Sequence, residues 1–274
     1  MYDIILTIHN KEELVERVLT AIKEFTTGVY TVNVVLDGCT DKSEELVEKF
    51  FSENDIDHRI LHTPDVFETK ANNHGIKNSN HEYIVIVQDD MVVNEMGWNE
   101  RLAKPVKQFD DVFAVTAKTA HGLSLNQWSR DINNPITIDE ARSRWCDILD
   151  YPDQADKSNT PRDIFAVRDT VNRGPLLIRR DRMEKLNYFD EEFSPQNMDD
   201  HDMCCRAYKE FGWVAGCYWV DVINDPEWAS TKTHDASRVP SWLYEAQQKN
   251  TRIIWNRHQD YVLGEKHNEN RKCE

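Results

Sequence analysis

Glycine is scarce in this chain, and neither of the common glycine-rich phosphate-binding motifs is present. Only 9 of the 274 residues are glycine, and the sequence contains no G-x-x-x-x-G-K-[ST] and no G-x-G-x-x-G. These absences exclude a site in which a glycine-rich loop cradles the phosphates of a nucleotide. A bound nucleotide would need another source of positive charge beside its phosphates.

Basic residues are also few relative to acidic ones. The chain has 33 Lys and Arg against 49 Asp and Glu, which gives a formal net charge of -16. Sequence-independent binding to nucleic acid relies on Lys and Arg to neutralise phosphates, so we expect no nucleic-acid partner. The same acidity would repel a phosphate-bearing substrate unless a metal ion intervened.

The six cysteines form no C-x-x-C pair, and no apolar run is long enough to cross a membrane. The cysteine pattern indicates neither a structural zinc site nor a disulfide framework, and reduced thiols are typical of a cytoplasmic location. A membrane span needs roughly 18 consecutive apolar residues, so we expect no transmembrane segment. The N-terminus enters a strand-like run at Ile4 and does not resemble a signal peptide. Peripheral contact with a membrane stays open.

Hydrophobic periodicity alternates between strand and helix over residues 4–90. Runs of Ile, Val and Leu predict strands at 4–8, 32–36, 59–62 and 84–89. Helical spacing predicts helices at 14–25, 46–51 and 71–78. The first two follow capping signals, at Asn10 with Glu13 and at Asp41 with Glu44. This β-α-β-α-β-α-β order predicts an α/β fold with a doubly wound, mostly parallel sheet.

The pattern weakens between Ala120 and Asn172, where turn signals such as Asn133-Asn134-Pro135 recur. We interpret this stretch as an irregular, substrate-facing excursion. The alternative is a surface insertion without a role. Strand character returns at 175–178, and helices are predicted at 183–186, 202–211 and 241–255. The charged tail from Gly264 is expected to be frayed.

The most informative feature is a run of β-branched residues that stops at Gln88, Asp89 and Asp90. The carboxyl ends of parallel strands form the ligand crevice of an open sheet, and two acids there can hold a divalent metal. Polar clusters at 7–10 and 37–41 end neighbouring strands and would meet at the same edge. The sequence thus predicts a nucleotide pocket in which a metal on Asp90 offsets diphosphate charge. The alternative is a plain solvated turn.

Several segments occur in the order and spacing of a known enzyme family. Residues 4–10, 36–41, 70–76 and 82–90 are similar to its Pro-Thr-Tyr-Asn, Asp-Asp-Gly-Ser-Thr-Asp, Ala-Arg-Asn-x-Gly and Asp-x-Asp segments. Residues 173–180, 188–193 and 198–206 resemble its strand before the acceptor site, Gly-Phe-Asp-Glu-x-Phe and Glu-Asp-x-Asp-Leu-x-x-x-Arg. Over residues 3–213 the chain therefore resembles an inverting glycosyltransferase of family 2 with the GT-A fold.

The resemblance implies a nucleotide-sugar donor, a UDP-sugar in first choice, and a Mn or Mg ion. Asp90 would coordinate the ion, and Gln88, which replaces an acid of the family, would hydrogen-bond a ribose hydroxyl. Whether Asp89 shares the ion stays open. His234 would be a late metal ligand, with an exposed loop histidine as the alternative. The other residues implied at the nucleotide are Thr7, His9 and Asp37 at the uracil and ribose, and Lys70 and Asn73 nearby.

The resemblance also implies a general base in the pair Asp199 and Asp200. We favour Asp200 as the base on the acceptor hydroxyl, which would attack the anomeric carbon in line and invert its configuration. Asp199 is the alternative base, and either residue could instead cap the following helix. Trp228 is expected near the acceptor, a glycan or another hydroxyl compound. Core positions are expected for Trp213, Trp219, Trp242, Cys204 and Cys205.

We expect a single GT-A domain over residues 1–274. Its parts would be a Rossmann-like nucleotide-sugar-binding half at 1–118, a mixed acceptor-binding half at 119–260 and a charged tail at 261–274. Two other functions remain as alternatives. A non-catalytic sugar- or nucleotide-binding module would account for Gln88 in the metal motif. A sugar-nucleotide nucleotidyltransferase would need a glycine-rich basic loop after the first strand, and residues 7–11 lack one.

Overall fold

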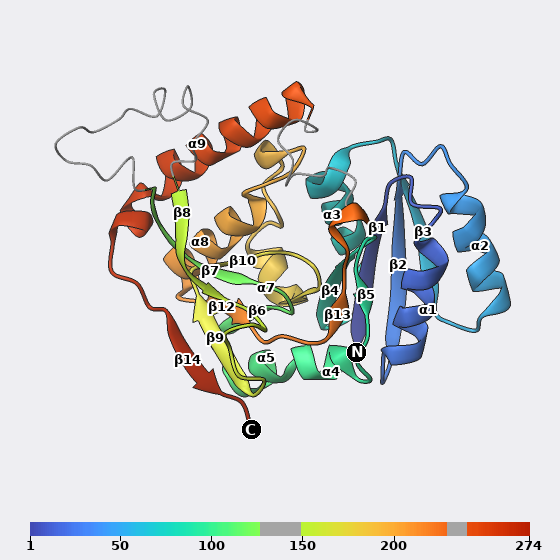
Figure 1. The fold of residues 1–274 in the computed structure, drawn as a ribbon, viewed down its shortest axis with the longest axis horizontal. Helices are drawn as coiled ribbons and strands as arrows, with labels where there is room; N and C mark the ends of the chain where they lie inside the picture. Colours follow the sequence, from blue (N-terminus) through green and yellow to red (C-terminus); the bar gives the residue numbers. More distant parts are fainter. Residues whose placement is uncertain (127–148, 229–239) are drawn as a thin grey trace.

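A nine-stranded sheet forms the centre of the molecule in the computed structural model, which describes residues 1–126, 149–228 and 240–274 (Figure 1). The strand order is β14-β9-β12-β6-β11-β4-β1-β2-β3. The neighbours β3, β2, β1 and β4 are parallel. β11 lies antiparallel to both β4 and β6, and β9 lies antiparallel to both β12 and β14. The predicted α/β class with a mostly parallel sheet is confirmed.

The N-terminal half has the predicted alternation of strands and helices. Helices α1, α2 and α3 each follow a strand and return the chain to the start of the next parallel strand, as a right-handed crossover does. The elements are β1 (Tyr2–Ile8), α1 (Val15–Phe25), β2 (Tyr30–Asp37), α2 (Ser43–Glu53), β3 (His58–Thr63), α3 (Phe67–Lys77), β4 (Tyr83–Gln88), β5 (Val92–Val93), α4 (Trp98–Leu102), α5 (Lys104–Gln108) and β6 (Val112–Thr116).

The C-terminal half adds antiparallel strands, one short helix and two longer helices. Besides joining the large sheet, it forms a three-stranded sheet of order β10-β7-β8. The elements are β7 (Ala120–Leu125), β8 (Leu149–Ala155), β9 (Ile164–Arg168), β10 (Thr170–Val171), β11 (Leu176–Arg179), α7 (Arg180–Lys185), η1 (Glu191–Phe193), α8 (Asp199–Phe211), β12 (Val214–Cys217), β13 (Val222–Ile223), η2 (Pro226–Trp228), α9 (Ser241–Leu263) and β14 (Glu269–Lys272).

Helices cover both faces of the large sheet, and β1 shows how the sequence sets this. Successive strand residues point to opposite faces. Ile4 and Leu6 pack in one core with apolar residues of α1, α2, α4 and α5. Ile5 packs in a second core with α3, α7 and α8. Both faces of β1 are therefore buried, which explains its continuous apolar run.

The capping box predicted at Asn10 and Glu13 is wrong. Helix α1 begins at Val15, and no side chain caps its N-terminus. The Oδ1 of Asn10 instead accepts hydrogen bonds from the backbone N–H groups of Thr40, at 2.7 Å, and Asp41, at 3.3 Å. Asn10 thus ties the loop after β1 to the loop after β2, and fixes two strand ends relative to each other.

The irregular excursion predicted for 120–172 and the frayed tail are also wrong within the described residues. β7, β8, β9 and β10 occupy much of that stretch, and β14 pairs with β9 at the sheet edge. β7, β8 and β10 contain few consecutive apolar residues, so periodicity does not mark them. β9 is an apolar run, Ile164 to Val167, that the prediction missed. The pairing of these strands with distant strands decides the structure. Residues 127–148 lie outside the described part.

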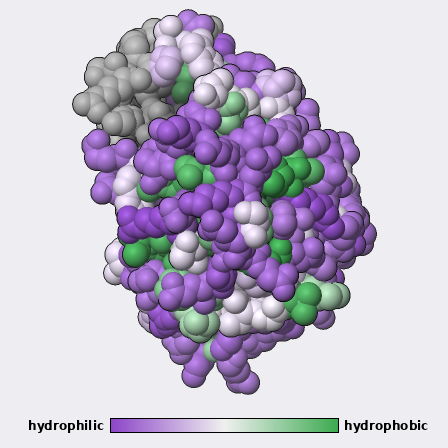
Figure 2. All heavy atoms as spheres, turned by 90° about the vertical axis from the view of Figure 1, so that its right-hand side faces the viewer, coloured by the Kyte–Doolittle hydropathy of each residue, from purple (hydrophilic) through white to green (hydrophobic). Residues whose placement is uncertain are grey.

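The surface is predominantly hydrophilic, in line with the high charge. Figure 2 views the side on which α2 lies and shows hydrophobic residues there only in small separate groups. Among the helices that the structure describes, none has the length and apolar character to span a membrane.

Asn250 of α9 provides a test of how the segment before α8 is held. Its buried side-chain amide donates to the carbonyl oxygens of Phe193 at 2.6 Å, Gln196 at 2.9 Å and Asn197 at 3.1 Å. Replacing this donor by a buried carboxylate in Asn250→Asp should lower the free energy of unfolding by about 3 kcal/mol, measured by urea denaturation. The matched control is Asn256→Asp, at an exposed position of the same helix. If the two substitutions lowered the free energy of unfolding equally, the hydrogen bonds of Asn250 would not hold the segment before α8.

Candidate functional site

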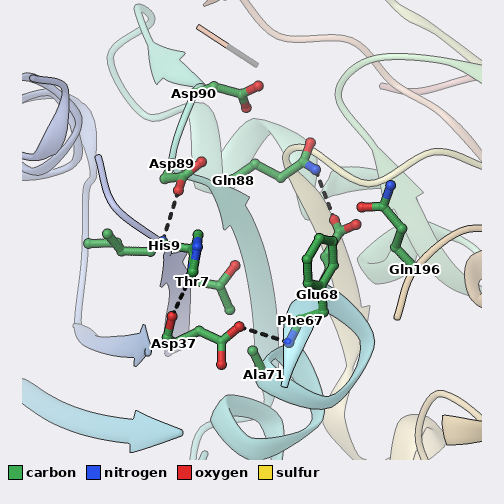
Figure 3. Close-up of a pocket in the computed structure, with 11 residues that line it drawn as sticks. Thr7, His9, Asp37, Phe67, Glu68, Ala71, Gln88, Asp89, Asp90 and Gln196 are labelled. Carbon is green, nitrogen blue, oxygen red and sulfur yellow. Dashed lines mark hydrogen bonds between the residues drawn. The ribbon is translucent and has the colours of Figure 1, made fainter. Parts of the chain in front are cut away.

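A cavity of about 140 Å³, the strand-end pocket, lies at the carboxyl ends of β1, β2 and β4 (Figure 3). The structure brings together six of the residues predicted for the nucleotide and metal site. They line the pocket with five others: Thr7, His9, Asp37, Gln88, Asp89 and Asp90, with Ile8, Phe67, Glu68, Ala71 and Gln196.

Asp37 lies in this pocket, but its carboxylate also organises the chain around it. It accepts hydrogen bonds from the hydroxyl of Thr63 at 2.8 Å and from the N–H groups of Val66 at 2.7 Å and Phe67 at 2.8 Å. Phe67 has a φ of 68°, a conformation that costs energy for a non-glycine residue and needs such support. Asp37 therefore fixes the start of α3 and the aromatic wall of the pocket.

His9 contributes its backbone and its ring to this end of the pocket. Its N–H donates to Asp89 Oδ2 at 3.2 Å, and its Nδ1 lies 2.6 Å from the carbonyl oxygen of Asp37. His9, Asp37 and the exposed Asp65 bring their ligand atoms within 4.8 Å of one another and form one candidate metal group. Because the Asp37 carboxylate already accepts three hydrogen bonds, this group has few free lone pairs for a cation.

Asp90 is the carboxylate that best fits a divalent cation. Its Oδ1 is buried and has no hydrogen-bond partner among the described residues. Such an oxygen is costly to bury unless a ligand satisfies it, and hard cations prefer oxygen ligands. Burial raises the pKa of the adjacent Asp89 to about 7, against the opposing effect of Lys11. The predicted ligand His234 lies outside the described residues.

Gln88 forms part of a polar wall behind the pocket. Its side-chain amide donates to Glu68 Oε1 at 2.9 Å. On its other side lies Gly174, with a φ of 98°, where a Cβ atom would come within 2.5 Å of Gln88 Oε1. The close approach and the positive φ both require glycine at this position.

Arg173 continues this wall. Its guanidinium is buried and contacts Glu68 Oε1 at 3.2 Å and Asp199 Oδ2 at 2.6 Å. Burial raises the pKa of Glu68, and the nearby charge of Arg173 opposes that rise. One cation thus compensates the buried Asp199 and the partly buried Glu68.

A second cavity of about 430 Å³, the α8 pocket, lies on the other side of this wall. It shares Glu68, Gln88 and Gln196 with the strand-end pocket. Lys118 lines it and interacts electrostatically with Asp90. Burial lowers the pKa of Lys118. The remaining lining residues are Asn172, Arg173, Asn197, Asp200, His201 and Gln247.

The two acids proposed as the base, Asp199 and Asp200, have different surroundings in the structure. Asp199 is fully buried, and both of its oxygens have partners: Arg173 on Oδ2 and the N–H of Asp200 on Oδ1. Asp200 lines the α8 pocket. Burial raises the pKa of Asp200, but His201 and Arg173 outweigh it, so the carboxyl titrates below its usual range. Neither acid caps α8, whose N-cap residue is Met198 without a side-chain hydrogen bond.

Two predicted nucleotide residues do not line either pocket. Lys70 is exposed on α3. Asn73 is buried, and its amide exchanges hydrogen bonds with the backbone of Phe189, at 2.8 Å and 3.1 Å. Asn73 therefore joins α3 to the segment before α8 and has a structural role.

The position of Trp228 near the acceptor stays a prediction, and the core position expected for Trp242 is wrong. Trp228 lies against Arg17, whose guanidinium is 4.6 Å from the ring centroid, and lines neither pocket. Trp242, expected in the core, is 51% exposed and packs edge-on against Phe67. Trp213 and Trp219 are half-buried against the second core, and Cys204 and Cys205 are buried as expected.

Sequence reasoning missed Glu68 and Arg173. Glu68 lies in the first turn of α3, which starts four residues before the predicted helix, at Phe67 rather than Ala71. Helix periodicity does not reveal this start, because Asp37 supports it from another strand. Arg173 precedes Gly174 and Pro175, and an arginine beside a turn at a buried strand was the available signal.

The fold is similar to that of several solved glycosyltransferases. GalNAc-T7 with UDP, GalNAc and Mn2+ aligns with a TM-score of 0.64 and 13% identity, over 96% of this chain and 50% of that chain. S. aureus TarS aligns with a TM-score of 0.55 and 16% identity, over 96% and 42%. A TarS fragment with UDP-GlcNAc aligns with a TM-score of 0.50 and 15% identity, over 79% and 55%.

This chain therefore spans about half the length of those chains, and at these identities the likeness is one of fold. It confirms the predicted GT-A architecture. No curated protein matches the chain. The sequence profile described as Glycosyl transferase family 2 matches residues 3–168, more than half of the chain, and the chain belongs to glycosyl transferase family 2.

Proposed function

We propose that this chain transfers a sugar from a UDP-sugar to a hydroxyl group of an acceptor. The reaction is a single in-line displacement that inverts the anomeric carbon and depends on a divalent cation. The main support is a pair of adjoining pockets with a common wall, one lined by Asp90 and the other by Asp200. The similar solved structures with UDP-GlcNAc, or with UDP and Mn2+, support the choice of donor and cation.

The donor binds in the strand-end pocket, with its nucleotide among Thr7, His9, Asp37 and Phe67. Asp90 would hold the cation through its free Oδ1, and the bound cation would offset the charge of the diphosphate. Lys118, which interacts with Asp90 from the α8 pocket, adds positive charge on that side. The cation and Lys118 would offset the electrostatic repulsion between the phosphates and a chain of net charge -16.

The acceptor binds in the α8 pocket. Asp200 accepts the proton of its hydroxyl while the hydroxyl oxygen forms the new bond to the anomeric carbon and the bond to the diphosphate breaks. The lowered pKa of Asp200 keeps the carboxylate ionised at neutral pH, ready to accept a proton. Asp199, paired with Arg173, keeps a structural role.

The cation site is tested by Asp90→Asn, which keeps the size of the side chain and removes its charge. UDP-sugar turnover should fall at least about 100-fold, and UDP binding should lose its dependence on Mn, as measured by UDP release and calorimetry. Asp65→Asn is the control, because Asp65 belongs to the other candidate metal group. If Asp65→Asn alone removes the Mn dependence, the cation lies beside His9 and Asp37 instead.

The two acids of α8 should respond differently to amide substitution. Asp200→Asn should bind UDP normally but lose transfer by about 100- to 10,000-fold, as removal of a general base does. Asp199→Asn leaves Arg173 without a buried partner and should lower the free energy of unfolding by about 3–5 kcal/mol. Transfer assays and denaturation of both variants decide this. An inactive but fully stable Asp199→Asn would move the base to Asp199.

The donor class is tested by a thermal-shift screen of UDP-, GDP- and TDP-sugars with and without Mn. A ligand that binds only the folded state raises the melting temperature. We expect the largest rise for a UDP-sugar with Mn. A larger rise for a GDP- or TDP-sugar would contradict the proposed donor.

A further inference from the structure

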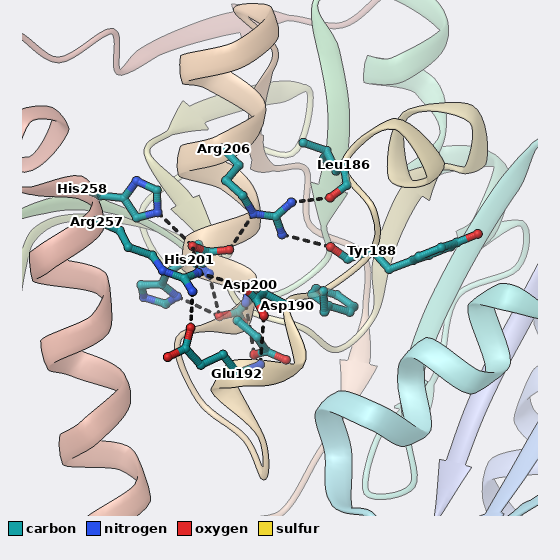
Figure 4. Close-up of polar contacts among 12 residues, drawn as sticks. Leu186, Tyr188, Asp190, Glu192, Asp200, His201, Arg206, Arg257 and His258 are labelled. Atoms are coloured by element: carbon teal, nitrogen blue, oxygen red, sulfur yellow. Dashed lines mark hydrogen bonds and ion pairs between the residues drawn. The ribbon is translucent and has the colours of Figure 1, made fainter.

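His201, the residue after Asp200, makes two contacts with that carboxylate (Figure 4). Its backbone N–H donates to Asp200 Oδ1 at 2.9 Å, and its ring Nδ1 lies 2.8 Å from the same oxygen. Both donors are on one residue and meet one oxygen. Within the described residues, no donor contacts Asp200 Oδ2.

These contacts fix which oxygen of Asp200 is available. Because an ionised carboxylate only accepts hydrogen bonds, Nδ1 of His201 carries a proton. Oδ1 is then occupied twice, and Oδ2 is the oxygen left to accept the proton of an acceptor hydroxyl in the α8 pocket.

The imidazole ring is itself held in place from the opposite side. Its Nε2 lies 3.1 Å from the hydroxyl of Tyr151, a residue of β8. The ring of Tyr151 packs against that of His121 of β7, with 4.6 Å between the ring centroids. Burial, with a further contribution from His201, lowers the pKa of His121 to about 4, so this neighbour stays neutral near pH 7. Tyr151 therefore connects the three-stranded sheet to the ring of His201, and His121 packs behind Tyr151.

We propose that His201 is a positioning residue that holds Oδ1 of Asp200 through its Nδ1–H and so directs Oδ2 toward the acceptor. The inference rests on the proposed function, since it concerns the base of the same reaction. The contact between His201 of α8 and Tyr151 of β8 would then orient the proposed base, in addition to packing the helix against the small sheet.

Two isosteric substitutions separate this role from a merely structural one. The amide nitrogen of asparagine in His201→Asn can occupy the place of Nδ1 and still donate to Asp200. The amide of glutamine in His201→Gln reaches the place of Nε2 and leaves Oδ1 without the side-chain donor. Both variants keep a polar side chain at the same buried position, and urea denaturation verifies that both fold.

We expect His201→Gln to lower kcat for UDP release from a UDP-sugar with Mn by about 100-fold, as misplacement of a catalytic group does, with the donor KM unchanged. His201→Asn should recover most of this loss. In His201→Gln the acid limb of the kcat profile should also move to higher pH, because a donor that lowers the pKa of Asp200 is gone. Equal kcat values and equal pH profiles in the two variants would overturn the proposal.

Nitrogen-15 NMR of histidine-labelled wild type tests the contact without any turnover. A proton on Nδ1 of His201, with a resonance that shifts in Asp200→Asn, supports the proposal, and an unprotonated Nδ1 overturns it. If wild type releases UDP from none of the sugars tested, the proposed function fails. The NMR result still decides whether His201 holds Asp200.

Discussion

The ion pairs of the buried Arg173 connect the two pockets, and with them the proposed cation site and the proposed base. Its guanidinium, with only 5% of the side chain exposed, contacts Glu68 on one side and Asp199 on the other. Glu68 in turn accepts from Gln88 at the end of β4, two residues before Asp90. Asp199 begins α8 and precedes Asp200. Removing one member of such a buried system leaves uncompensated charge, so the proposed cation site and base depend on the same contact.

The second constraint is charge. The proposed diphosphate donor requires this strongly acidic chain to limit the negative charge that faces it, and the structure does so in three ways. Asp199 is paired and buried, Asp89 has a pKa raised to about 7 by burial, and the carboxylate of Asp37 accepts hydrogen bonds from the segment before α3. Asp90 keeps a buried Oδ1 that no described residue hydrogen-bonds, and Asp200 accepts hydrogen bonds from the described residues only on its Oδ1. Acidic side chains of the same type therefore have different surroundings, and the proposed roles in binding the cation and accepting the proton go to Asp90 and Asp200.

The fold of the N-terminal half was predictable because its signals are local. The strands at 4–8 and 32–36 are buried on both faces and consist of Ile, Val and Leu except for Thr7 and Asn33. Parallel strands bring their ends together by topology alone, and Thr7, Asp37 and Gln88 therefore met in one pocket as expected. The order of the helices followed from the same pattern.

The rest could not be predicted because long-range contacts decide it. The start of α3 depends on the N–H groups of Val66 and Phe67 donating to Asp37, a contact between distant residues that no local pattern marks. Asn10 and Glu13 match a capping box, but Asn10 bonds to another loop. Among the strands after Ala120, β7, β8 and β10 have no clear local signal and are defined by pairing with one another. The role of His201 also required geometry, since a histidine beside two acids has no distinctive sequence pattern.

One feature of the large sheet bears on whether copies of this chain can pair through their sheet edges. An unpaired sheet edge offers free N–H and C=O groups to any passing extended chain. At one edge of this sheet lies β14, a four-residue strand of Glu, Asn, Arg and Lys. Arg271 of this strand is held by a bidentate ion pair with Asp111, at 2.7 Å and 2.9 Å. A short, charged and anchored border of this kind discourages self-association through strand addition, and protects a sheet whose interior strands are rich in Ile and Val.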